Sequence, residues 1–339
     1  MKSLILIGDA RQRLAELPAG SARTCITSPP YFGLRDYGVD GQIGLEETPE
    51  AYVAEMVSLF REVWRVLADD GTLWLNIGDS YASFRDGKAT PDTTRGDSTG
   101  TLVPKGNAKN RMASTFQGTG IKHKDLIGIP WRVAFALQAD GWYLRSDIIW
   151  HKPNPMPESV TDRPTKSHEY LFLLTKKPKY FYDYEAVKEP LADSTWGRAA
   201  RAESAKVKYG SPARPDSKQV IGGIDQSHAY AGLATGRSNG YDTETGKRNK
   251  RDVWTINTKP FKGAHFAVMP EALVEPCVLA GSAEGDTVLD PFTGSGTVAV
   301  VANRHGRNFV GTELNAEYAQ IAYQRITNDA PMLNEVETR

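Results

Sequence analysis

Cysteine is scarce in this chain of 339 residues, and apolar runs of membrane-spanning length are missing. Cys25 and Cys277 are the only cysteines and both stand among apolar residues, so the sequence predicts two buried free thiols and neither a disulfide framework nor a cysteine-based zinc site. The opening segment, residues 1–9, has too short an apolar run for a signal peptide. These absences predict a soluble, cytoplasmic protein with no membrane partner and no metal.

Net charge is also absent, because 41 basic residues balance 41 acidic ones. The balance hides a segregation along the chain: residues 198–262 contain 13 Lys and Arg against six Asp and Glu, whereas the sequence beyond residue 263 contains four against ten. A local basic patch is sufficient to neutralise phosphates, so the basic segment is a candidate nucleic-acid surface, and a solvated polar loop is the alternative. The cluster that we expect to contact the phosphates of such a partner comprises Lys247, Arg248, Lys250 and Arg251.

The most informative motif is Ser28-Pro29-Pro30-Tyr31, which follows the apolar run Arg23–Thr27. Consecutive prolines supply no N–H, so carbonyl oxygens at this strand end are expected to stay unpaired beside a hydroxyl and an aromatic ring. The Ser28 hydroxyl and a carbonyl near Pro29 can accept the N–H bonds of an exocyclic amino group, and Tyr31 can stack on a flat base. A plain strand-to-turn exit is the alternative, because proline clusters punctuate many loops.

A second motif follows the short apolar strand 286–290. Its glycines allow a close backbone approach to a ligand, and the helix that starts next offers free N–H groups. The dinucleotide fingerprint G-x-G-x-x-G and the P-loop are both missing, yet a further strand, 308–312, ends at an acid where doubly wound folds bind ribose hydroxyls. We therefore predict a nucleotide-type cofactor loop with these residues: Asp290, Pro291, Phe292, Gly294, Ser295, Gly296, Thr297 and Glu313.

Together the two motifs resemble those of the amino-methylating DNA methyltransferases, which use S-adenosylmethionine. Their order, with the catalytic motif first and the cofactor loop last, is similar to the β class of that family. The resemblance implies that Asp290, Gly294 and Gly296 shape the pocket for the cofactor methionine. It also implies that Glu313 holds the ribose and that Asp9 faces the adenine. Capping of a turn or helix is the alternative for Asp9 and Asp290.

The resemblance also implies the reaction. A base flipped out of double-stranded DNA enters a pocket, and its amino nitrogen attacks the cofactor methyl in line without a covalent enzyme intermediate. Ser28 and the Pro29 carbonyl accept the amino N–H bonds, so that positioning and electrostatics supply most of the rate. In this family Ser at the first catalytic position is associated with cytosine-N4 methylation, so cytosine is favoured and adenine-N6 is the alternative.

Two other classes of function are less favoured. An RNA or protein-glutamine methyltransferase would carry its catalytic motif after the cofactor loop, and a non-catalytic DNA-binding module would have no reason to keep both motifs. The family resemblance implies a bacterial or phage-encoded enzyme of restriction–modification type. It leaves open a homodimer and a companion restriction nuclease.

The predicted fold class is α/β, with a doubly wound, mostly parallel, Rossmann-like sheet of seven strands and a polar target-recognition insertion. Expected strands lie at 3–7, 23–27, 72–77, 143–150, 169–175, 286–290 and 308–312, and expected helices at 9–17, from 48 onward, 126–139 and 298–304. We expect residues 1–189 to form the catalytic part, with a mobile loop at 84–124. Residues 190–255 are expected to form the target-recognition region, residues 256–330 the cofactor-binding part and residues 331–339 a tail. Further pocket candidates, which can equally satisfy neighbouring backbone, are Asp79, Asn154 and Glu169.

Overall fold

The structure of the chain is a computed structural model that describes most of its length. The described residues are 1–34, 38–82, 119–191, 220–221, 224–225, 241–242, 245–258, 269–331 and 334–339. They form two compact units: the larger unit comprises Met1–Tyr182 with Asp252–Arg339, and the smaller unit comprises Asp183–Arg251. Most of the expected loop 84–124 and much of the expected recognition region 190–255 lie outside the described residues.

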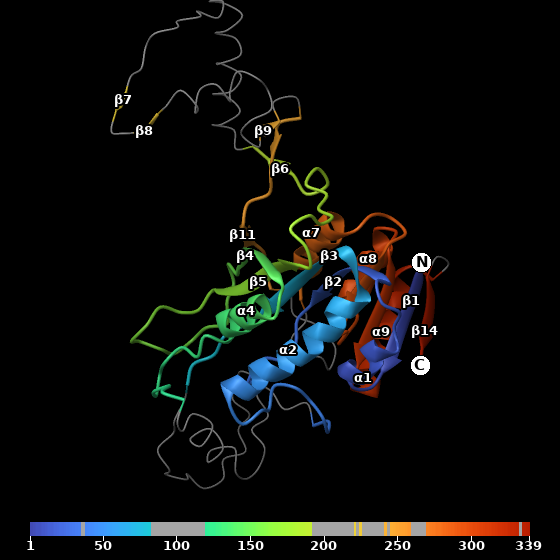
Figure 1. The fold of residues 1–339 in the computed structure, drawn as a ribbon, viewed down its shortest axis with the longest axis horizontal. Coiled ribbons are helices and arrows are strands. Elements are labelled where there is room, and N and C mark those ends of the chain that lie inside the picture. Colours follow the sequence, from blue (N-terminus) through green and yellow to red (C-terminus); the bar gives the residue numbers. More distant parts are fainter. Residues whose placement is uncertain are drawn as a thin grey trace, which may run out of the picture. The chain divides into compact units, whose positions relative to one another are not determined.

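A nine-stranded sheet forms the centre of the larger unit (Figure 1). Its strands are β1 (Lys2–Ile7), β2 (Ala22–Thr27), β3 (Leu67–Ile77), β4 (Tyr143–His151), β5 (His168–Thr175), β11 (Val253–Thr255), β12 (Thr287–Asp290), β13 (Asn308–Glu313) and β14 (Glu335–Thr338). Their order is β11-β4-β5-β3-β2-β12-β13-β1-β14. Of the described strands in this sheet, β5 alone is antiparallel to its neighbours, which are β3 and β4.

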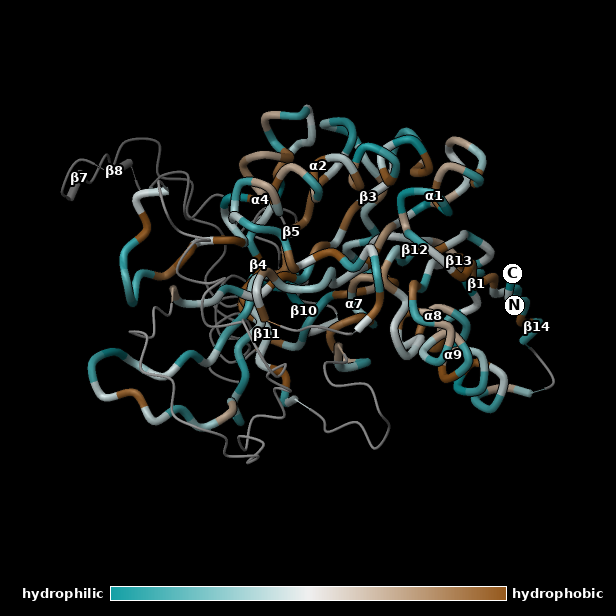
Figure 2. Tube along the Cα trace, turned by 90° about the horizontal axis from the view of Figure 1, so that it is seen from below, coloured by the Kyte–Doolittle hydropathy of each residue, from teal (hydrophilic) through white to brown (hydrophobic). Residues whose placement is uncertain are grey.

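Helices cover both faces of this sheet (Figure 2). One face carries α1 (Ala10–Ala15), α2 (Pro49–Val66) and α4 (Ile129–Ala139), and the other carries α7 (Glu271–Gly281), α8 (Thr297–Arg304) and α9 (Ala316–Asp329). The predicted doubly wound, mostly parallel architecture is therefore confirmed. The sequence analysis did not predict α9.

The strand count differs from the predicted seven because both edges of the sheet are extended. β11 pairs with β4, placing Trp254 opposite Trp150, and β14 pairs with β1. The tail expected at 331–339 thus contributes a strand instead. An edge strand leaves a row of N–H and C=O groups unpaired, and the two short strands pair with these groups on β4 and β1.

The start of α2 shows how the local sequence determines an element. Thr48 accepts a hydrogen bond from the Ala51 amide at 3.1 Å, and Pro49 occupies the first helical position, where its missing N–H has no cost. The helix then buries one apolar face at three-to-four-residue spacing, as its pattern predicts. The buried residues on this face include Tyr52, Met56, Leu59, Phe60 and Val63.

The smaller unit contains short strands in its described residues. β6 (Glu189–Pro190), β10 (Lys247–Arg248) and β9 (Tyr241–Asp242) form an antiparallel sheet in that order. β7 (Val220–Ile221) pairs with β8 (Ile224–Asp225).

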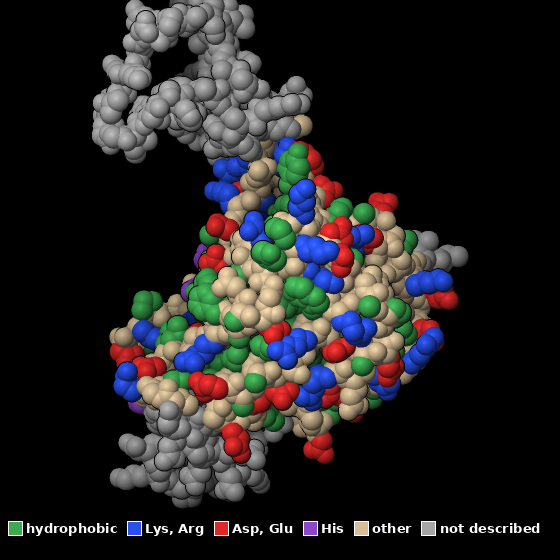
Figure 3. Space-filling view, viewed as in Figure 1, with side chains coloured by type: hydrophobic (Ala, Val, Ile, Leu, Met, Phe, Trp, Pro, Cys, Tyr) green, Lys and Arg blue, Asp and Glu red, His purple; other side chains and the backbone are tan. Residues whose placement is uncertain are grey.

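Several composition-based expectations can be compared with the structure. Cys25 and Cys277 are buried free thiols, as predicted. Among the described helices, none has the length and apolar character needed to cross a membrane. Within the described ranges, His, Cys, Asp and Glu side chains form no group of three or more that could hold a metal ion. Basic and acidic side chains are interspersed over the coloured surface in Figure 3.

Candidate active site

Both sequence motifs line one cavity in the larger unit. The cavity has a volume of about 390 Å³ and lies where β2, β12 and β13 end, which is the edge at which open α/β sheets bind ligands. All four candidate catalytic residues line it. The candidate cofactor residues that line it are Asp9, Asp290, Pro291, Phe292, Gly294, Ser295, Thr297 and Glu313. The exception is Gly296, which lies outside the cavity wall formed by the described residues.

A direct contact joins the two motifs. β2 and β12 are parallel neighbours, with Thr24 opposite Val288 and Cys25 opposite Leu289. At their carboxyl ends, the buried Thr27 hydroxyl donates a hydrogen bond of 2.7 Å to Asp290 Oδ1. The catalytic strand is therefore tied to the first residue of the cofactor loop.

Asp290 is a buried acid with a strongly perturbed pKa. The residue is 2% exposed, and Oδ1 also accepts a hydrogen bond from the Phe292 amide at 3.0 Å. Burial raises the pKa of Asp290 to about 7, and the Glu313 charge adds to the rise, whereas the hydrogen bonds from Thr27 and Phe292 oppose it. The capping alternative is thus present, because Asp290 does cap its own turn, but the side chain also faces the cavity.

The cofactor loop is fixed by the acid that ends β13. Glu313 accepts a hydrogen bond from the Gly294 amide at 2.8 Å and another from the Asn315 amide at 2.9 Å, and burial raises its pKa. Gly294 has a φ of +52°, in the left-handed region that glycine adopts without strain. Gly296 also has a positive φ, and a Cβ there would lie 2.9 Å from Ala322 Cβ of α9. Its smallness therefore allows α9 to pack behind the loop.

Arg325 on α9 holds the same loop from behind. Its Nη1 donates to the Ser295 carbonyl at 2.6 Å, to Ser295 Oγ at 2.8 Å and to Thr297 Oγ1 at 3.2 Å. Burial lowers the pKa of Arg325 from its ordinary value, yet a guanidinium remains charged in proteins. The sequence analysis missed this residue. The apolar spacing of Ala319, Ala322 and Ile326 could have predicted the helix but not this contact.

Asp9 has a structural partner as well as a place in the cavity wall. It caps α1 by accepting a hydrogen bond from the Arg11 amide at 2.8 Å, and its Oδ2 lies 2.5 Å from Arg11 Nη2. The hydrogen bond from the Arg11 side chain lowers the pKa of Asp9. Capping and cavity lining therefore occur together at this residue.

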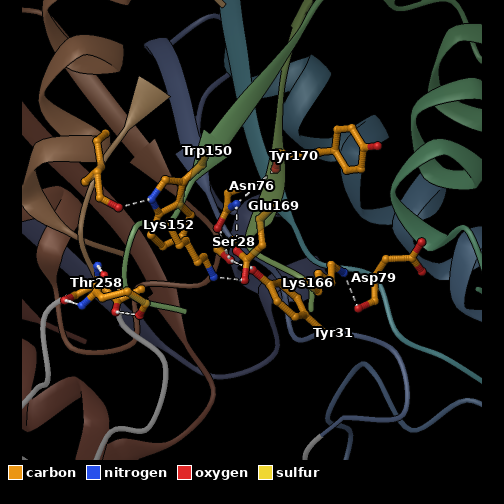
Figure 4. A network of polar contacts seen from close by, with 12 residues as sticks. Ser28, Tyr31, Asn76, Asp79, Trp150, Lys152, Lys166, Glu169, Tyr170 and Thr258 are labelled. Atoms are coloured by element: carbon orange, nitrogen blue, oxygen red, sulfur yellow. Dashed lines mark hydrogen bonds and ion pairs between the residues drawn. The ribbon is translucent and has the colours of Figure 1, made fainter. Parts of the chain in front are cut away.

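The catalytic motif lies in a network of polar side chains (Figure 4). Ser28 Oγ donates to Asn76 Oδ1 at 3.2 Å and lies 3.5 Å from the Tyr31 hydroxyl. The Tyr31 hydroxyl lies 2.8 Å from Glu169 Oε2 and 3.2 Å from Asn76 Oδ1. Asn76 Nδ2 donates to Glu169 Oε2 at 3.3 Å and to the Tyr170 carbonyl at 3.1 Å, which fixes the direction of its amide.

The position of the Tyr31 ring depends on a missing side chain. A Cβ added to Gly78 would lie 2.4 Å from Tyr31 Cε2, so the ring lies directly against the backbone at the end of β3. Desolvation, with the nearby Glu169 charge, raises the pKa of Tyr31 well above its ordinary value. Tyr31 is therefore a neutral phenol that donates its proton.

The two proline carbonyls differ. Tyr52 of α2 donates its hydroxyl proton to the Pro30 carbonyl at 2.9 Å, so the expected unpaired oxygen is not found at Pro30. Among the described residues, the Pro29 carbonyl accepts no hydrogen bond, and Pro29 lines the cavity. Tyr52 is thus more than a packing residue, because it anchors the motif to α2.

Lys152 is a second residue that the sequence analysis missed. Its ammonium group forms an ion pair with Glu169 Oε1 and lies 4.2 Å from the centre of the Trp150 ring. Lys152, Trp150 and Glu169 all line the cavity, beside the Ser28 motif. Their positions at the end of β4 and the start of β5 could have indicated a site, but not the pairing.

The other pocket candidates bond to backbone. Asn154 exchanges hydrogen bonds with Thr258, accepting at 3.0 Å and donating to its carbonyl at 3.1 Å. Asp79 accepts hydrogen bonds from the Gly128 and Ile129 amides, which explains why α4 starts at Ile129 rather than near 126. Neither Asn154 nor Asp79 lines the cavity.

Two members of the expected DNA-binding cluster form ion pairs with an acid of the smaller unit. Glu189 Oε1 lies 2.9 Å from Arg248 Nε and 2.6 Å from Arg251 Nε. Lys247 and Arg248 form β10, and Arg251 is largely exposed. Part of this cluster therefore has an acidic partner in the chain itself.

A doubly wound sheet with a glycine loop and a polar cavity at its strand ends defines a Rossmann-like enzyme that acts with a nucleotide-type cofactor. The sequence profile of the DNA methylase family matches residues 22–324. The chain is 47% identical over 322 residues to the Type II methyltransferase M.Cfr9I of Citrobacter freundii, covering 95% of this chain and 87% of that relative. It is also 47% identical over 322 residues to the Type II methyltransferase M.SmaI of Serratia marcescens, covering 95% of this chain and 90% of that relative. The chain belongs to the N6/N4 DNA methylase family, which confirms the class predicted from its two motifs.

Solved structures share the fold. PvuII DNA methyltransferase, which is cytosine-N4-specific, matches with a TM-score of 0.58 at 16% identity, covering 99% of this chain and 94% of that chain. A protein of Thermus thermophilus, solved in complex with S-adenosyl-L-methionine, matches with a TM-score of 0.55 at 22% identity, covering 99% of each chain. These likenesses confirm the Rossmann-like methyltransferase fold.

Proposed function

We propose that this protein methylates the exocyclic amino group of a base in double-stranded DNA, with S-adenosylmethionine as the methyl donor and cytosine N4 as the favoured target. One observation carries the proposal: the Ser28 hydroxyl and the 290–297 loop line the same cavity. The Type II methyltransferase relatives, which are bacterial, support a role in restriction–modification.

The cofactor side of the cavity fits this donor. S-adenosylmethionine carries a sulfonium and an ammonium group, and the Asp290 carboxylate in the wall suits positive charge. Glu313, in the same wall, is the acid proposed for the ribose hydroxyls. The left-handed Gly294 permits a close backbone approach, and Arg325 fixes the loop. When bound, the cofactor supplies an electrophilic methyl group.

The target side of the cavity supplies acceptors for an amino group. Ser28 donates its own proton to Asn76, so the lone pairs of Ser28 Oγ are available for an incoming N–H. The Pro29 carbonyl supplies a second acceptor in the same wall. Two such acceptors draw electron density toward the amino nitrogen, which makes a delocalised amine a better nucleophile. Tyr31, held by Gly78 and Glu169, offers a ring on which a base can stack.

Lys152 supports cytosine over adenine. Beside its amino group, cytosine presents two acceptors, N3 and O2, whereas adenine presents only N1 on that edge. Lys152 places an ammonium donor in the wall that holds Ser28, which suits the base with the additional acceptor. The Lys152 donor favours cytosine-N4 methylation, as does the serine at the first position of the catalytic motif, which in this family is associated with that product.

Nucleoside analysis tests the proposal. Plasmid DNA would be incubated with the protein and S-adenosylmethionine and then digested to nucleosides. The nucleosides would be separated by chromatography and identified by mass spectrometry. N4-methyldeoxycytidine, resolved chromatographically from its 5-methyl isomer, is the expected product. N6-methyldeoxyadenosine would transfer the assignment to adenine, and no methylated nucleoside would overturn the proposal.

A further inference from the structure

The Glu169 carboxylate accepts a hydrogen bond from Tyr31 of the Ser-Pro-Pro-Tyr motif. Of the acids that line the described cavity, Asp9, Asp290 and Glu313 belong to the cofactor side, whereas Glu169 contacts Tyr31 at 2.8 Å and Asn76 at 3.3 Å. It lies on β5, the antiparallel strand, whose backbone runs opposite to that of β3. The Lys152 ammonium group is the other partner of this carboxylate in the cavity wall.

The proposed reaction creates a need for such a group. When an amino nitrogen takes a methyl group it becomes positively charged and must lose one of its protons. Ser28 contacts that nitrogen in the proposed function, but a neutral hydroxyl can accept a proton only if it passes its own proton onward. The chain therefore needs an anionic group beyond Ser28.

We propose that Glu169 is the terminal acceptor of this proton, which reaches it through the hydroxyls of Ser28 and Tyr31. This inference rests on the proposed function. The oxygens of Ser28 and Tyr31 lie 3.5 Å apart, and the Tyr31 oxygen lies 2.8 Å from Glu169 Oε2. Asn76 Oδ1 lies 3.2 Å from both hydroxyl oxygens and keeps them side by side (Figure 4).

The relay moves one proton and leaves both hydroxyls unchanged. An N–H bond of the methylated amino group breaks, its electron pair stays on nitrogen, and the proton joins Ser28 Oγ. For this step the Ser28 hydroxyl turns from Asn76 Oδ1 to the Tyr31 oxygen, and its proton passes to that oxygen as the Tyr31 proton passes to Glu169 Oε2. Glu169 ends as a neutral carboxylic acid, and the nitrogen ends uncharged. Release of the proton to solvent after the reaction restores the carboxylate.

Lys152 and Trp150 hold the acceptor in place. The Lys152 ammonium pairs with Oε1 of Glu169, which leaves Oε2 toward Tyr31, and it lies over the Trp150 ring. The Lys152 and Glu169 side chains are 17% and 16% exposed, so water screens the pair weakly. The ion pair therefore fixes which oxygen of Glu169 faces the Tyr31 hydroxyl.

Replacement of Glu169 tests the relay. In Glu169→Gln the shape is kept and the acceptor is lost, so kcat for methyl transfer to DNA should fall about 100-fold while the KM values for cofactor and DNA change little. In Glu169→Ala, added formate should restore part of kcat in proportion to its concentration, because a small carboxylate can occupy the gap. Glu158→Gln is the matched control, since Glu158 pairs with Arg163 and lies outside the cavity wall; its kcat should equal that of the wild type.

Each outcome decides between the relay and the proposed function. No methyl transfer by the wild-type protein would overturn the proposed function, and the relay with it. If the wild-type protein transfers methyl groups normally and Glu169→Gln does so with the same kcat, the relay would be overturned and the proposed function would stand. A low kcat in Glu169→Ala that formate leaves unchanged, in a variant that still binds cofactor by calorimetry, would assign Glu169 a purely structural role and also overturn the relay.

Discussion

The Thr27 hydroxyl donates a hydrogen bond of 2.7 Å to Asp290, a residue 263 positions away in the sequence. Thr27 directly precedes the catalytic motif, and Asp290 begins the cofactor loop. Since β2 and β12 are parallel neighbours, the two motifs reach the same edge of the sheet and share one wall of the cavity. The geometry of one motif therefore depends on the other.

Ser28→Ala should leave cofactor affinity nearly unchanged and lower turnover by about 10²–10³-fold, because the variant removes an acceptor that acts on the target amino group. Calorimetric titration with S-adenosylmethionine and a tritium-transfer assay would measure the two effects. Ser21→Ala is the control, since the exposed Ser21 hydroxyl bonds only to the Pro18 carbonyl among the contacts described. Unchanged turnover in Ser28→Ala would remove Ser28 from the mechanism.

Gly294→Val should abolish cofactor binding while the sheet remains folded. A side chain would fill the cavity wall, and a β-branched residue at a φ of +52° carries a strain of about 1–2 kcal/mol. Gly20→Val controls for the strain, because Gly20 has a φ of +70° with nothing within 4 Å of an added Cβ. If both variants bind S-adenosylmethionine normally, the loop has been misassigned.

Asp290 should make cofactor binding depend on pH. Its raised pKa means that the folded protein retains a proton that the unfolded chain loses between pH 3.8 and about 7, so the free energy of unfolding falls as pH rises through this window and is flat above it. A cationic cofactor favours the ionised carboxylate. Affinity should therefore rise with pH up to about 7, with proton release on binding.

Calorimetry in two buffers of different ionisation enthalpy would count the released protons. Asp290→Asn should show weaker binding with a flatter pH dependence and less proton release. Glu313, whose pKa is also raised by burial, stays in this variant and serves as the internal control. Wild-type proton release that is unaltered in Asp290→Asn would exclude Asp290 as its source.

Arg325→Met should weaken cofactor binding about tenfold. The variant removes hydrogen bonds from a charged group to Ser295 and Thr297, each of which is worth about 1.5–3 kcal/mol, and part of this loss falls on the loop's bound conformation. Arg61→Met is the matched control, because Arg61 is largely exposed and pairs with Asp140 away from the cavity. Equal cofactor affinity in the wild type, Arg325→Met and Arg61→Met would show that the loop holds its shape without the Arg325 contacts from α9.

The basic cluster should separate into two pairs. Lys247→Gln with Lys250→Gln should lower the log–log salt slope of DNA binding by about 1.8, which is about 0.9 for each lost phosphate contact. Arg248→Gln with Arg251→Gln should also unfold part of the smaller unit, because Glu189 loses its partners. Salt titrations of DNA binding, with limited proteolysis within residues 183–251 as the folding control, distinguish the two pairs. An unchanged salt slope in a variant that carries all four substitutions would exclude the cluster as a phosphate contact.

Local patterns in the sequence were sufficient to predict most of the fold. Glycine and proline at fixed offsets mark the two loops, and apolar runs between them locate β1, β2, β12 and β13 to within a residue or two. The family resemblance added the order of the motifs. The extra strands escaped prediction because β11 has three residues and β14 has four, too few for a period to be recognised.

The contacts that complete the candidate site could not be predicted in the same way. Asn76 and Glu169 are 93 residues apart, and they meet only because β3 and β5 are antiparallel neighbours. The Lys152 ion pair depends on the register of β4 against β5, and the Arg325 contacts depend on the packing of α9. A single sequence contains no signal for a register until the partners are known.

The position of α9 has a thermodynamic consequence. Its Ala322 packs against Gly296, and its Arg325 holds Ser295, so the helix and the loop stabilise each other. Local unfolding of α9 and loss of the cofactor are then coupled equilibria. A ligand that binds the ordered loop should therefore also protect the amides of the helix from hydrogen exchange.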